Sequence, residues 1–392
     1  MSGADRSARR DRMALSLVVE AGDPRLAAAL VDREPGAVLE AVRAGDPGIP
    51  EPWRARARSL EARVASTLAR ARDARLRWVC PGDADWPAPL DDLDHVGVHA
   101  GVAGRPLGLW MRGRRDLAAD GGVAVVGSRD ATAYGCDVAA DLAADLAESG
   151  RCVLSGAALG IDGAAHRGAL AVGGPTLAVL ACGADVDYPR AHAGLLTRLS
   201  EVGAVVSEQP PGSAPTRARF LTRNRLIAAL GAGTVVVEAA VRSGALNTLG
   251  WAAELGRLVH AVPGPVTNRS SSGVHQAIRD GRAVLAASAA DVLEDHGGLL
   301  ADGLARTPGS RAASTWWDAL APRARQVLEE VPAAGGISGP RLADEIGRRP
   351  DDVEATLRSL AAAGLVARTE RGWRLVRRAD LEPADGRPTL RE

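Results

Sequence analysis

Val123-Ala-Val-Val-Gly127-Ser128-Arg129 decides the fold, because an unbroken apolar run ends there in a glycine, a hydroxyl and a guanidinium. Residues 134–148 follow with apolar side chains at helical spacing and stop before Gly150, so the stretch reads as a strand that turns into a helix. The turn lacks the GxGxxG pattern, which disfavours a dinucleotide, and we expect no cofactor. Gly127, Ser128, Arg129 and the first amides of the helix can instead hold a phosphate.

The same alternation of strand and helix continues to Leu285. Strands are expected at 123–127, 152–156, 176–180, 204–208, 234–238, 258–262 and 283–285, and helices at 134–148, 162–171, 190–202, 219–230, 246–255 and 274–280. Apolar strands between amphipathic helices indicate an α/β fold whose parallel sheet is covered on both faces. Right-handed crossovers make the sheet doubly wound and place its binding site outside the carboxyl ends of the strands.

Composition divides the chain into five predicted segments. They are a helical N-terminal domain at 1–78, the α/β domain at 79–297, a linker at 298–315, a winged-helix domain at 316–378 and a disordered tail at 379–392. The N-terminal segment has 15 Arg and 11 acidic residues, and we favour a solvated helical cap over a nucleic-acid-binding or partner-binding module.

The winged helix is indicated by helical patterns at 317–330, 340–346 and 351–363, followed by a hairpin of 364–368 with 372–376. Its third helix opens with Asp351, Asp352 and Glu354 and has Arg358 as its only basic residue. These carboxylates would repel phosphates, so we favour a protein contact for this domain over a DNA contact.

Composition also excludes several classes of protein. Among 392 residues there are 48 basic residues, all Arg, and 48 acidic ones, so whole-chain charge predicts no polyanionic partner. The four Cys show no CxxC or Cys/His ligand spacing, so we expect neither a disulfide framework nor a metal site. The longest uncharged run, 168–184, falls short of the ~20 apolar residues of a membrane span. The apolar stretch at residues 13–19 is not followed by the small residues of a signal-peptide cleavage site, so we predict a cytoplasmic protein.

The second strand–helix junction is rich in glycine and carries candidate ligand-binding residues, namely Ser155, Gly156, Gly160, Asp162 and His166. Asp162 fits a helix N-cap, and His166 lies one turn later on the same face. The alternative is structural: Asp162 only caps the helix, and His166 is a buried residue with its hydrogen bonds satisfied.

The densest signal surrounds the only Phe of the chain and consists of Arg217, Arg219, Phe220, Arg223, Asn224 and Arg225. Arginines grip phosphates and an aromatic ring offers a face to a base, which is the chemistry of single-strand binding. A cationic cluster at the positive end of a helix needs an anion to explain it, although a solvated helix start is the alternative. Phe220 and Arg223 are three residues apart and should face the same side. Later junctions add Arg242, Ser243, Gly244 and Gly264.

These motifs together resemble the DNA-processing protein A family, also called DprA or Smf. The resemblance spans about residues 85–294, and it includes Arg223-Asn224-Arg225 and Val262-Pro263-Gly264. It implies an extended Rossmann-like, mostly parallel sheet that binds single-stranded DNA and loads the recombinase RecA in natural transformation. It also implies a homodimer without catalytic residues, and single-strand binding protein is a further expected partner. Residues 245–248 and 271–276 depart from the family pattern, and Arg must replace any Lys that contacts DNA.

Two other functions compete with this interpretation. Gly231-x-Gly233-Thr234-Val-Val-Val-Glu238 distantly resembles a motif of nucleoside-monophosphate phosphoribohydrolases, which would make the protein an enzyme. A transcription regulator could instead combine the winged helix with a phosphate-sensing core. A nucleotide hydrolysis assay and a titration with single-stranded and double-stranded oligonucleotides separate the three.

Overall fold

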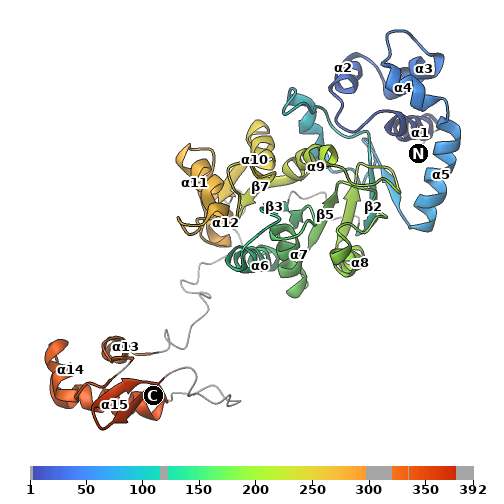
Figure 1. Cartoon of the computed structure of the whole chain (residues 1–392). Coiled ribbons are helices and arrows are strands. Elements are labelled where there is room, and N and C mark those ends of the chain that lie inside the picture. The colour runs from blue at the N-terminus through green and yellow to red at the C-terminus, as the bar shows by residue number, and fades with distance from the viewer. Residues whose placement is uncertain (1–2, 115–121, 297–319, 334, 377–392) are drawn as a thin grey trace. The chain divides into compact units, whose positions relative to one another are not determined.

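The computed structural model describes residues 3–114, 122–296, 320–333 and 335–376 (Figure 1). The chain divides into two compact units, Met1–Gly303 and Leu304–Glu392. The predicted linker at 298–315 and the predicted tail at 379–392 lie outside the described residues. None of the helices that the structure describes has the length and apolar character that a bilayer crossing requires.

A nine-stranded sheet forms the centre of the first unit, in the order β1-β2-β6-β5-β4-β3-β7-β8-β9. The strands are β1 (Arg77–Val79), β2 (Leu109–Gly113), β3 (Gly122–Val126), β4 (Val153–Ser155), β5 (Thr176–Leu180), β6 (Ala204–Ser207), β7 (Gly231–Val236), β8 (Leu258–Ala261) and β9 (Val284–Leu285). Strands β3 to β9 are parallel, whereas β2 pairs antiparallel with β6 and β1 pairs antiparallel with β2. The predicted doubly wound, mostly parallel sheet is therefore confirmed, and the antiparallel edge of β1 and β2 adds to it.

Helices cover both faces of this sheet (Figure 1). One face carries α6 (Ala133–Glu148), α7 (Ile161–Ala171), α8 (Ala193–Val202) and α12 (Ala289–His296), and the other carries α9 (Arg217–Leu230), α10 (Ala245–Glu254) and α11 (Ser272–Arg279). Val123 and Val125 pack in the core beneath α6, and Ala124 and Val126 pack in the core beneath α9. The alternation follows from the two-residue period of a strand, which explains why both sets of positions are apolar.

The order of the strands places a reversal next to β3. Strands β4 to β6 are added on one side of β3, and β7 to β9 are added on the other. Crevices form at the carboxyl ends of strands where such a reversal occurs. The loops after β3, β4, β6 and β7 therefore meet at one rim, which we call the carboxyl rim.

Five N-terminal helices pack beside β2. They are α1 (Gly3–Val18), α2 (Pro24–Asp32), α3 (Pro35–Ala44), α4 (Glu51–Ala57) and α5 (Leu60–Asp73), and a short 3-10 helix η1 (Ala88–His95) follows β1. Leu15 and Trp53 share one hydrophobic core with Trp110 of β2 and Val205 of β6. The predicted helical character is confirmed. The N-terminal helices share this core with the sheet, and the predicted domain division at residue 78 stays a prediction.

The second unit contains α13 (Pro322–Glu329), α14 (Gly339–Glu345), α15 (Pro350–Ala362), β10 (Val366–Thr369) and β11 (Gly372–Leu375). The hairpin of β10 and β11 is extended by a bridge between Ile337 and Trp373. Leu342, Leu357 and Val366 lie in a hydrophobic core of this unit's own. Three helices and a hairpin in this order form the small helix–hairpin region that the winged-helix pattern predicts.

Candidate nucleic-acid interface

The first two junctions of the carboxyl rim interlock through their backbones. Gly127 has no space for a side chain, because a Cβ atom would lie 2.5 Å from Cγ1 of Ile161. The Ser128 amide donates to the Glu238 carbonyl (2.7 Å), and the Ser128 carbonyl accepts from the Ile161 amide (3.2 Å). Gly160 has φ +77° and packs against the same carbonyl, so a side chain there would be strained. The loops after β3, β4 and β7 thus form one rigid platform.

Arg129 projects from this platform onto the ring of Phe220. The guanidinium carbon lies 4.0 Å from the ring centroid, and the Tyr188 ring lies 5.7 Å away on a tilted plane. Arg129 and Tyr188 are exposed and Phe220 is half-buried. The three side chains border a small hollow of about 60 Å³ that Leu159 and Cys182 also line. Flat aromatic and guanidinium surfaces open to solvent are suited to stacking with nucleic-acid bases.

Tyr188 is a member of this site that sequence reasoning missed. It lies in the loop between β5 and the short helix η3 (Arg190–His192), where no periodic pattern exists. Its exposed fraction of 39% is unusual for a large ring, but exposure cannot be read from the sequence. Only the folded loop brings it to Phe220.

Arg223 turns away from the rim into the protein. It is 6% exposed, and its Nη1 donates to the Val179 carbonyl at 2.6 Å. Gly156 passes directly over its guanidinium and has no room for a side chain. Burial lowers the pKa of Arg223 to about 10, and Asp162 opposes that shift, so the group stays charged at neutral pH. Phe220 and Arg223 both lie against the Gly156 loop, but Arg223 is buried and bonded within the protein, so it supports that loop from below.

Asp162 has a different role from the predicted N-cap. The cap position of α7 is Gly160, and Asp162 is the second residue of the helix. Its Oδ2 accepts the amides of Gly156 (3.1 Å) and Ala158 (3.4 Å). Burial raises its pKa, while Arg223 and these amides act in the opposite direction. Asp162 and Arg223 together hold the second junction loop in shape.

His166 is buried, as the structural alternative expects, but of its two ring nitrogens only Nδ1 has a hydrogen-bond partner among the described residues. It is fully buried, and its Nδ1 lies 2.8 Å from Oγ1 of Thr176. Because the Thr176 hydroxyl donates to the Val153 carbonyl (2.8 Å), it must accept from Nδ1 of His166. Burial, then the charges of His192 and Arg223, lower the pKa of His166 to about 3. The imidazole is therefore neutral and does not reach the surface.

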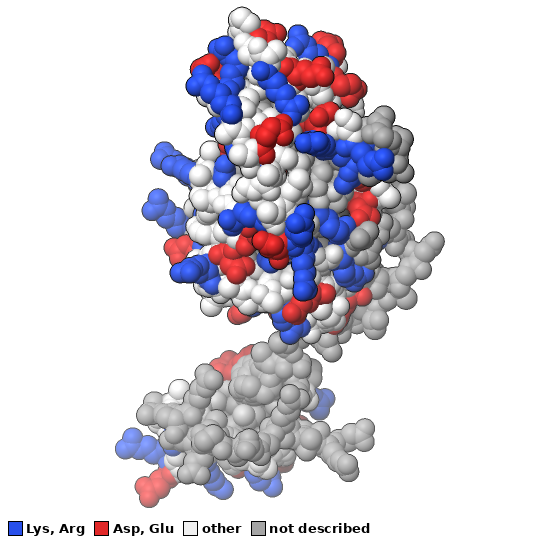
Figure 2. All heavy atoms as spheres, turned by 90° about the vertical axis from the view of Figure 1, so that its right-hand side faces the viewer, with Lys and Arg blue, Asp and Glu red and all other residues white. Residues whose placement is uncertain are grey.

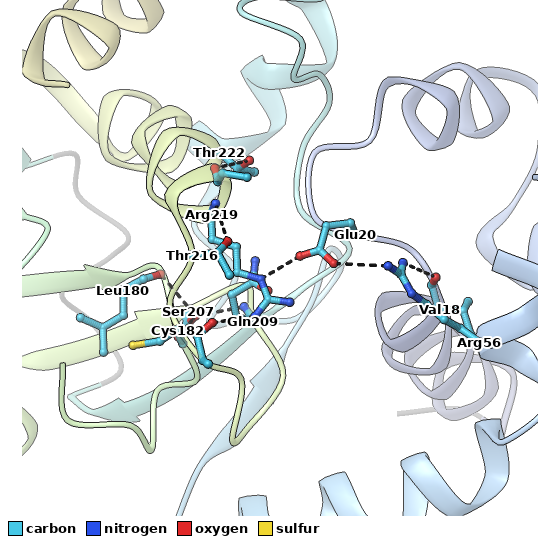
Figure 3. Close-up of polar contacts among 12 residues, drawn as sticks. Val18, Glu20, Arg56, Leu180, Cys182, Ser207, Gln209, Thr216, Arg219 and Thr222 are labelled. Atoms are coloured by element: carbon cyan, nitrogen blue, oxygen red, sulfur yellow. Dashed lines mark hydrogen bonds and ion pairs between the residues drawn. The ribbon is translucent and has the colours of Figure 1, made fainter. Parts of the chain in front are cut away.

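The remaining arginines of the α9 cluster separate by exposure. Arg225 is fully buried and donates through Nη1 and Nη2 to the Glu208 carboxylate at 2.7 and 2.8 Å. Arg219 is bonded to Glu20 of the N-terminal region at 2.8 Å (Figure 3). Arg217 is exposed and forms no ion pair with any carboxylate that the structure describes. Of the four predicted phosphate-binding arginines, only Arg217 is free to bind.

The junctions after β7 and β8 are also shaped by internal bonds. Asn224 donates from Nδ2 to the Gly244 carbonyl (3.2 Å), and the Ser243 hydroxyl accepts the Ala245 amide (3.3 Å). Gly264 receives a close contact from Ser271 that excludes a side chain. Arg242 is exposed, and no carboxylate within the described ranges pairs with it.

Two buried side chains fix the platform from within. The Ser155 hydroxyl donates to the Val125 carbonyl (2.6 Å), which ties β4 to β3. The Glu238 carboxylate accepts the Thr132 hydroxyl (2.6 Å) and the Thr132 amide (2.9 Å), and it is fully buried. Glu238 therefore anchors the start of α6.

The positive charge at the rim comes from a few exposed arginines and not from the net charge of the chain, which is zero. Figure 2 shows arginines and carboxylates interspersed over the face that it displays, as the zero net charge predicts. Arg129, Arg217 and Arg242 are exposed at the rim, and none of them is paired with a carboxylate in the parts of the chain that the structure describes. They are the cations available to an anionic ligand.

Comparisons with known proteins point in the same direction. The profile of the family "DNA recombination-mediator protein A" matches residues 77–297. The chain is 43% identical over 369 residues to the putative DNA processing protein DprA of Mycobacterium tuberculosis, with 93% of each chain covered. The X-ray structure of DNA processing protein A from Streptococcus pneumoniae superposes with a TM-score of 0.61 at 29% identity, covering 73% of this chain and 97% of that one. A structure reported for the single-stranded DNA binding mode of the Helicobacter pylori protein shares the fold, with a TM-score of 0.50 at 24% identity over 57% of this chain and 97% of that one.

Proposed function

This chain belongs to the DNA recombination-mediator protein A family, and on that premise we propose that it binds single-stranded DNA at the carboxyl rim and delivers the strand to RecA. The observation that carries the proposal is the surface formed by Arg129, Phe220 and Tyr188. Its flat groups are open to solvent and lie beside exposed, unpaired arginines.

Single strands suit this surface better than duplexes. In a duplex the faces of the bases are stacked on one another, whereas a single strand can present them to an aromatic ring. Every base has such a face, so binding should be largely indifferent to sequence. Arg129, Arg217 and Arg242 are placed to neutralise phosphates while a base stacks on Phe220. The Helicobacter pylori protein, which shares the fold, is itself reported to bind single-stranded DNA.

The buried polar residues of the rim favour binding over catalysis. Glu238, the carboxylate of the phosphoribohydrolase-like motif, is fully buried and bonded to Thr132. His166 is also fully buried and is neutral, so it offers no accessible acid or base. These residues organise loops, and the exposed residues carry the ligand chemistry.

Delivery to RecA, assembly as a homodimer and contact with single-strand binding protein rest on the resemblance to the family. RecA delivery would need the strand to be released without breaking sequence-specific bonds, which a stacking surface with phosphate-binding arginines allows. We include these partners in the proposal.

Titration of the full chain with labelled single-stranded and double-stranded oligonucleotides tests the DNA part. We expect single strands to bind more tightly, with log K falling by about 0.7 per log unit of salt for each phosphate neutralised. Equal affinity for both forms would overturn the assignment. A second measurement follows RecA filament growth on strands coated with single-strand binding protein. Faster growth with wild-type protein than with an Arg129→Gln variant is expected, and no acceleration would refute the mediator role.

A further inference from the structure

A cleft of about 930 Å³ lies between the N-terminal helices and the sheet. Its walls come from α1, α2, α4 and α5 on one side, and from residues 93–98, 103–107 and 208–213 on the other. Within the part of the chain that the structure describes, no Phe, Tyr or Trp lines this N-terminal cleft. Six arginines and five carboxylates line it, and because several of those carboxylates are bonded to other residues, an anionic ligand that need not be aromatic suits the cleft.

Two of these arginines form no direct ion pair with any carboxylate that the structure describes. Arg12 of α1 and Arg63 of α5 are half-buried in the cleft wall, and neither pairs with a carboxylate of the described residues. Burial and the nearby charge of Arg105 lower the pKa of Arg12, and burial and Arg56 lower that of Arg63. Arg105 is paired with Asp91 and Asp94, while the more distant charges of Glu34 and Asp94 on Arg12, and of Glu20 on Arg63, act in the opposite direction on these pKa values. Half-buried cations beside like charges are stabilised by an incoming anion.

Glu20 occupies the mouth of the N-terminal cleft. Its carboxylate bonds Arg219 of α9 at 2.8 Å and approaches Arg56 of α4 at 3.9 Å, so it bridges the two walls (Figure 3). Arg56 also donates to the Val18 carbonyl at 3.1 Å. A carboxylate held between two arginines occupies the position that a phosphate would take.

The start of α9 separates the N-terminal cleft from the hollow at the carboxyl rim. Arg219 lines the cleft, and the next residue, Phe220, carries the stacking surface of the rim. Both residues belong to the first turn of α9, which begins at Arg217 and is capped by Thr216. A strand stacked on Phe220 therefore needs only to pass the start of this helix to enter the cleft.

We propose that single-stranded DNA leaving the carboxyl rim continues into the N-terminal cleft, where Arg12, Arg56 and Arg63 hold its phosphates and displace Glu20 from Arg219. The proposal rests on the proposed function, because it assumes that a strand occupies the rim. Without an aromatic platform the cleft grips the backbone and leaves the bases unread. The N-terminal helices are then part of the DNA path.

Fluorescence anisotropy with the full chain and two oligothymidylates, about 6 and about 24 nucleotides long, tests this path. The variants are Arg12→Gln/Arg63→Gln and Arg63→Gln alone. The matched control is Arg72→Gln, an exposed residue of the same helix α5 that does not line the cleft. Thermal melts establish that each variant is folded, and the single variant covers the case in which the double variant is not.

We expect the double variant to bind the long oligonucleotide about tenfold more weakly, with the salt slope reduced by about 1.4 for two phosphates. The short oligonucleotide, which the rim alone can hold, should bind as it does to wild type. Glu20→Gln should tighten the long complex by about two- to fivefold, because it frees Arg219 and Arg56. Arg72→Gln should behave as wild type.

Equal affinity of Arg12→Gln/Arg63→Gln and Arg72→Gln for the long oligonucleotide would overturn this inference and leave the proposed function intact. Calorimetric titration with dTMP tests whether the cleft binds the phosphate of a free mononucleotide and not that of a DNA strand. If dTMP binds wild type and not Arg63→Gln while the long oligonucleotide is unaffected, the cleft is a mononucleotide site and the inference is wrong. A wild-type protein that binds neither length would overturn the proposed function and this inference together.

Discussion

Replacing Phe220 by Ala is the sharpest test of the rim, because Arg129 packs on this ring and the proposed function stacks a base on it. A base stacked on an aromatic side chain contributes about 1–3 kcal/mol, which corresponds to a loss of about 5- to 150-fold in affinity. The guanidinium of Arg129 lies 4.0 Å from the ring centroid, and such a contact contributes about 0.5–1 kcal/mol at an exposed site. Phe220→Ala should therefore weaken single-strand binding within that range and also release Arg129.

The two residues should not act independently. Arg129→Ala should lower affinity and reduce the salt slope by about 0.7, whereas Phe220→Ala should lower affinity without changing the slope, because a stack releases no counterion. Since the side chains touch, the double variant should deviate from additivity by about 0.5–1 kcal/mol. Leu221→Ala changes an exposed apolar neighbour on the same helix and serves as the control.

Thermal melts beside oligonucleotide titrations separate binding from folding. Truncating an aromatic side chain in a closed core to Ala costs about 3–5 kcal/mol of stability. Phe220 is half-buried, so Phe220→Ala should cost less. A Phe220→Ala protein that is destabilised, yet binds with wild-type affinity when folded, would refute the stacking role. Full additivity of the Arg129 and Phe220 changes would refute their coupling.

Three further outcomes follow from the buried groups and from the division into two units. His166 has a pKa of about 3 in the folded state against 6.5 in the unfolded chain, so stability is complete above pH 6.5 and falls as the pH drops towards 3. At pH 5 about 2 kcal/mol should be lost, and urea unfolding of His166→Asn should lack this part of the pH dependence. Arg225→Met leaves the Glu208 carboxylate without its buried partner and should cost about 3–5 kcal/mol in chemical denaturation, much of which Glu208→Leu should restore in the double variant. Removing residues 304–392 should leave single-strand affinity largely intact, since the rim lies in the first unit, and a titration showing most of it lost from a folded core would contradict this.

Much of the fold could be predicted because its signals are local. Strand β5 runs from Thr176 to Leu180 as expected, and the other predicted core elements lie within a few residues of their expected bounds. Each is a short apolar run or a helical repeat ended by glycine, and such patterns depend on neighbours in sequence. The strands β1 and β2 were not predicted, because three and five residues carry too little periodicity to stand out.

The site was predicted as a region but not residue by residue. The motifs at Gly127, Gly156 and Gly244 do border one rim, since the carboxyl ends of parallel strands meet at one edge of a sheet. The direction of each arginine on α9 could not be predicted. Residues 222–230 of this helix are all buried, because it packs against the sheet on one side and other helices on the other. Helical spacing cannot separate an inner from an outer face when both are covered.

The sequence by itself determined the α/β architecture, the glycine turns and the family, because these depend on residues that are close along the chain. The tertiary structure alone decided which polar groups reach solvent. Arg223 and Arg225 are buried because the Val179 carbonyl and the Glu208 carboxylate, which are distant in sequence, receive them. Arg129 is exposed on Phe220 because the loop after β3 and the start of α9 converge, although strands β4, β5 and β6 lie between them in the chain. A charged side chain is buried where polar or charged partners compensate for its desolvation, and only the folded chain brings those partners into place.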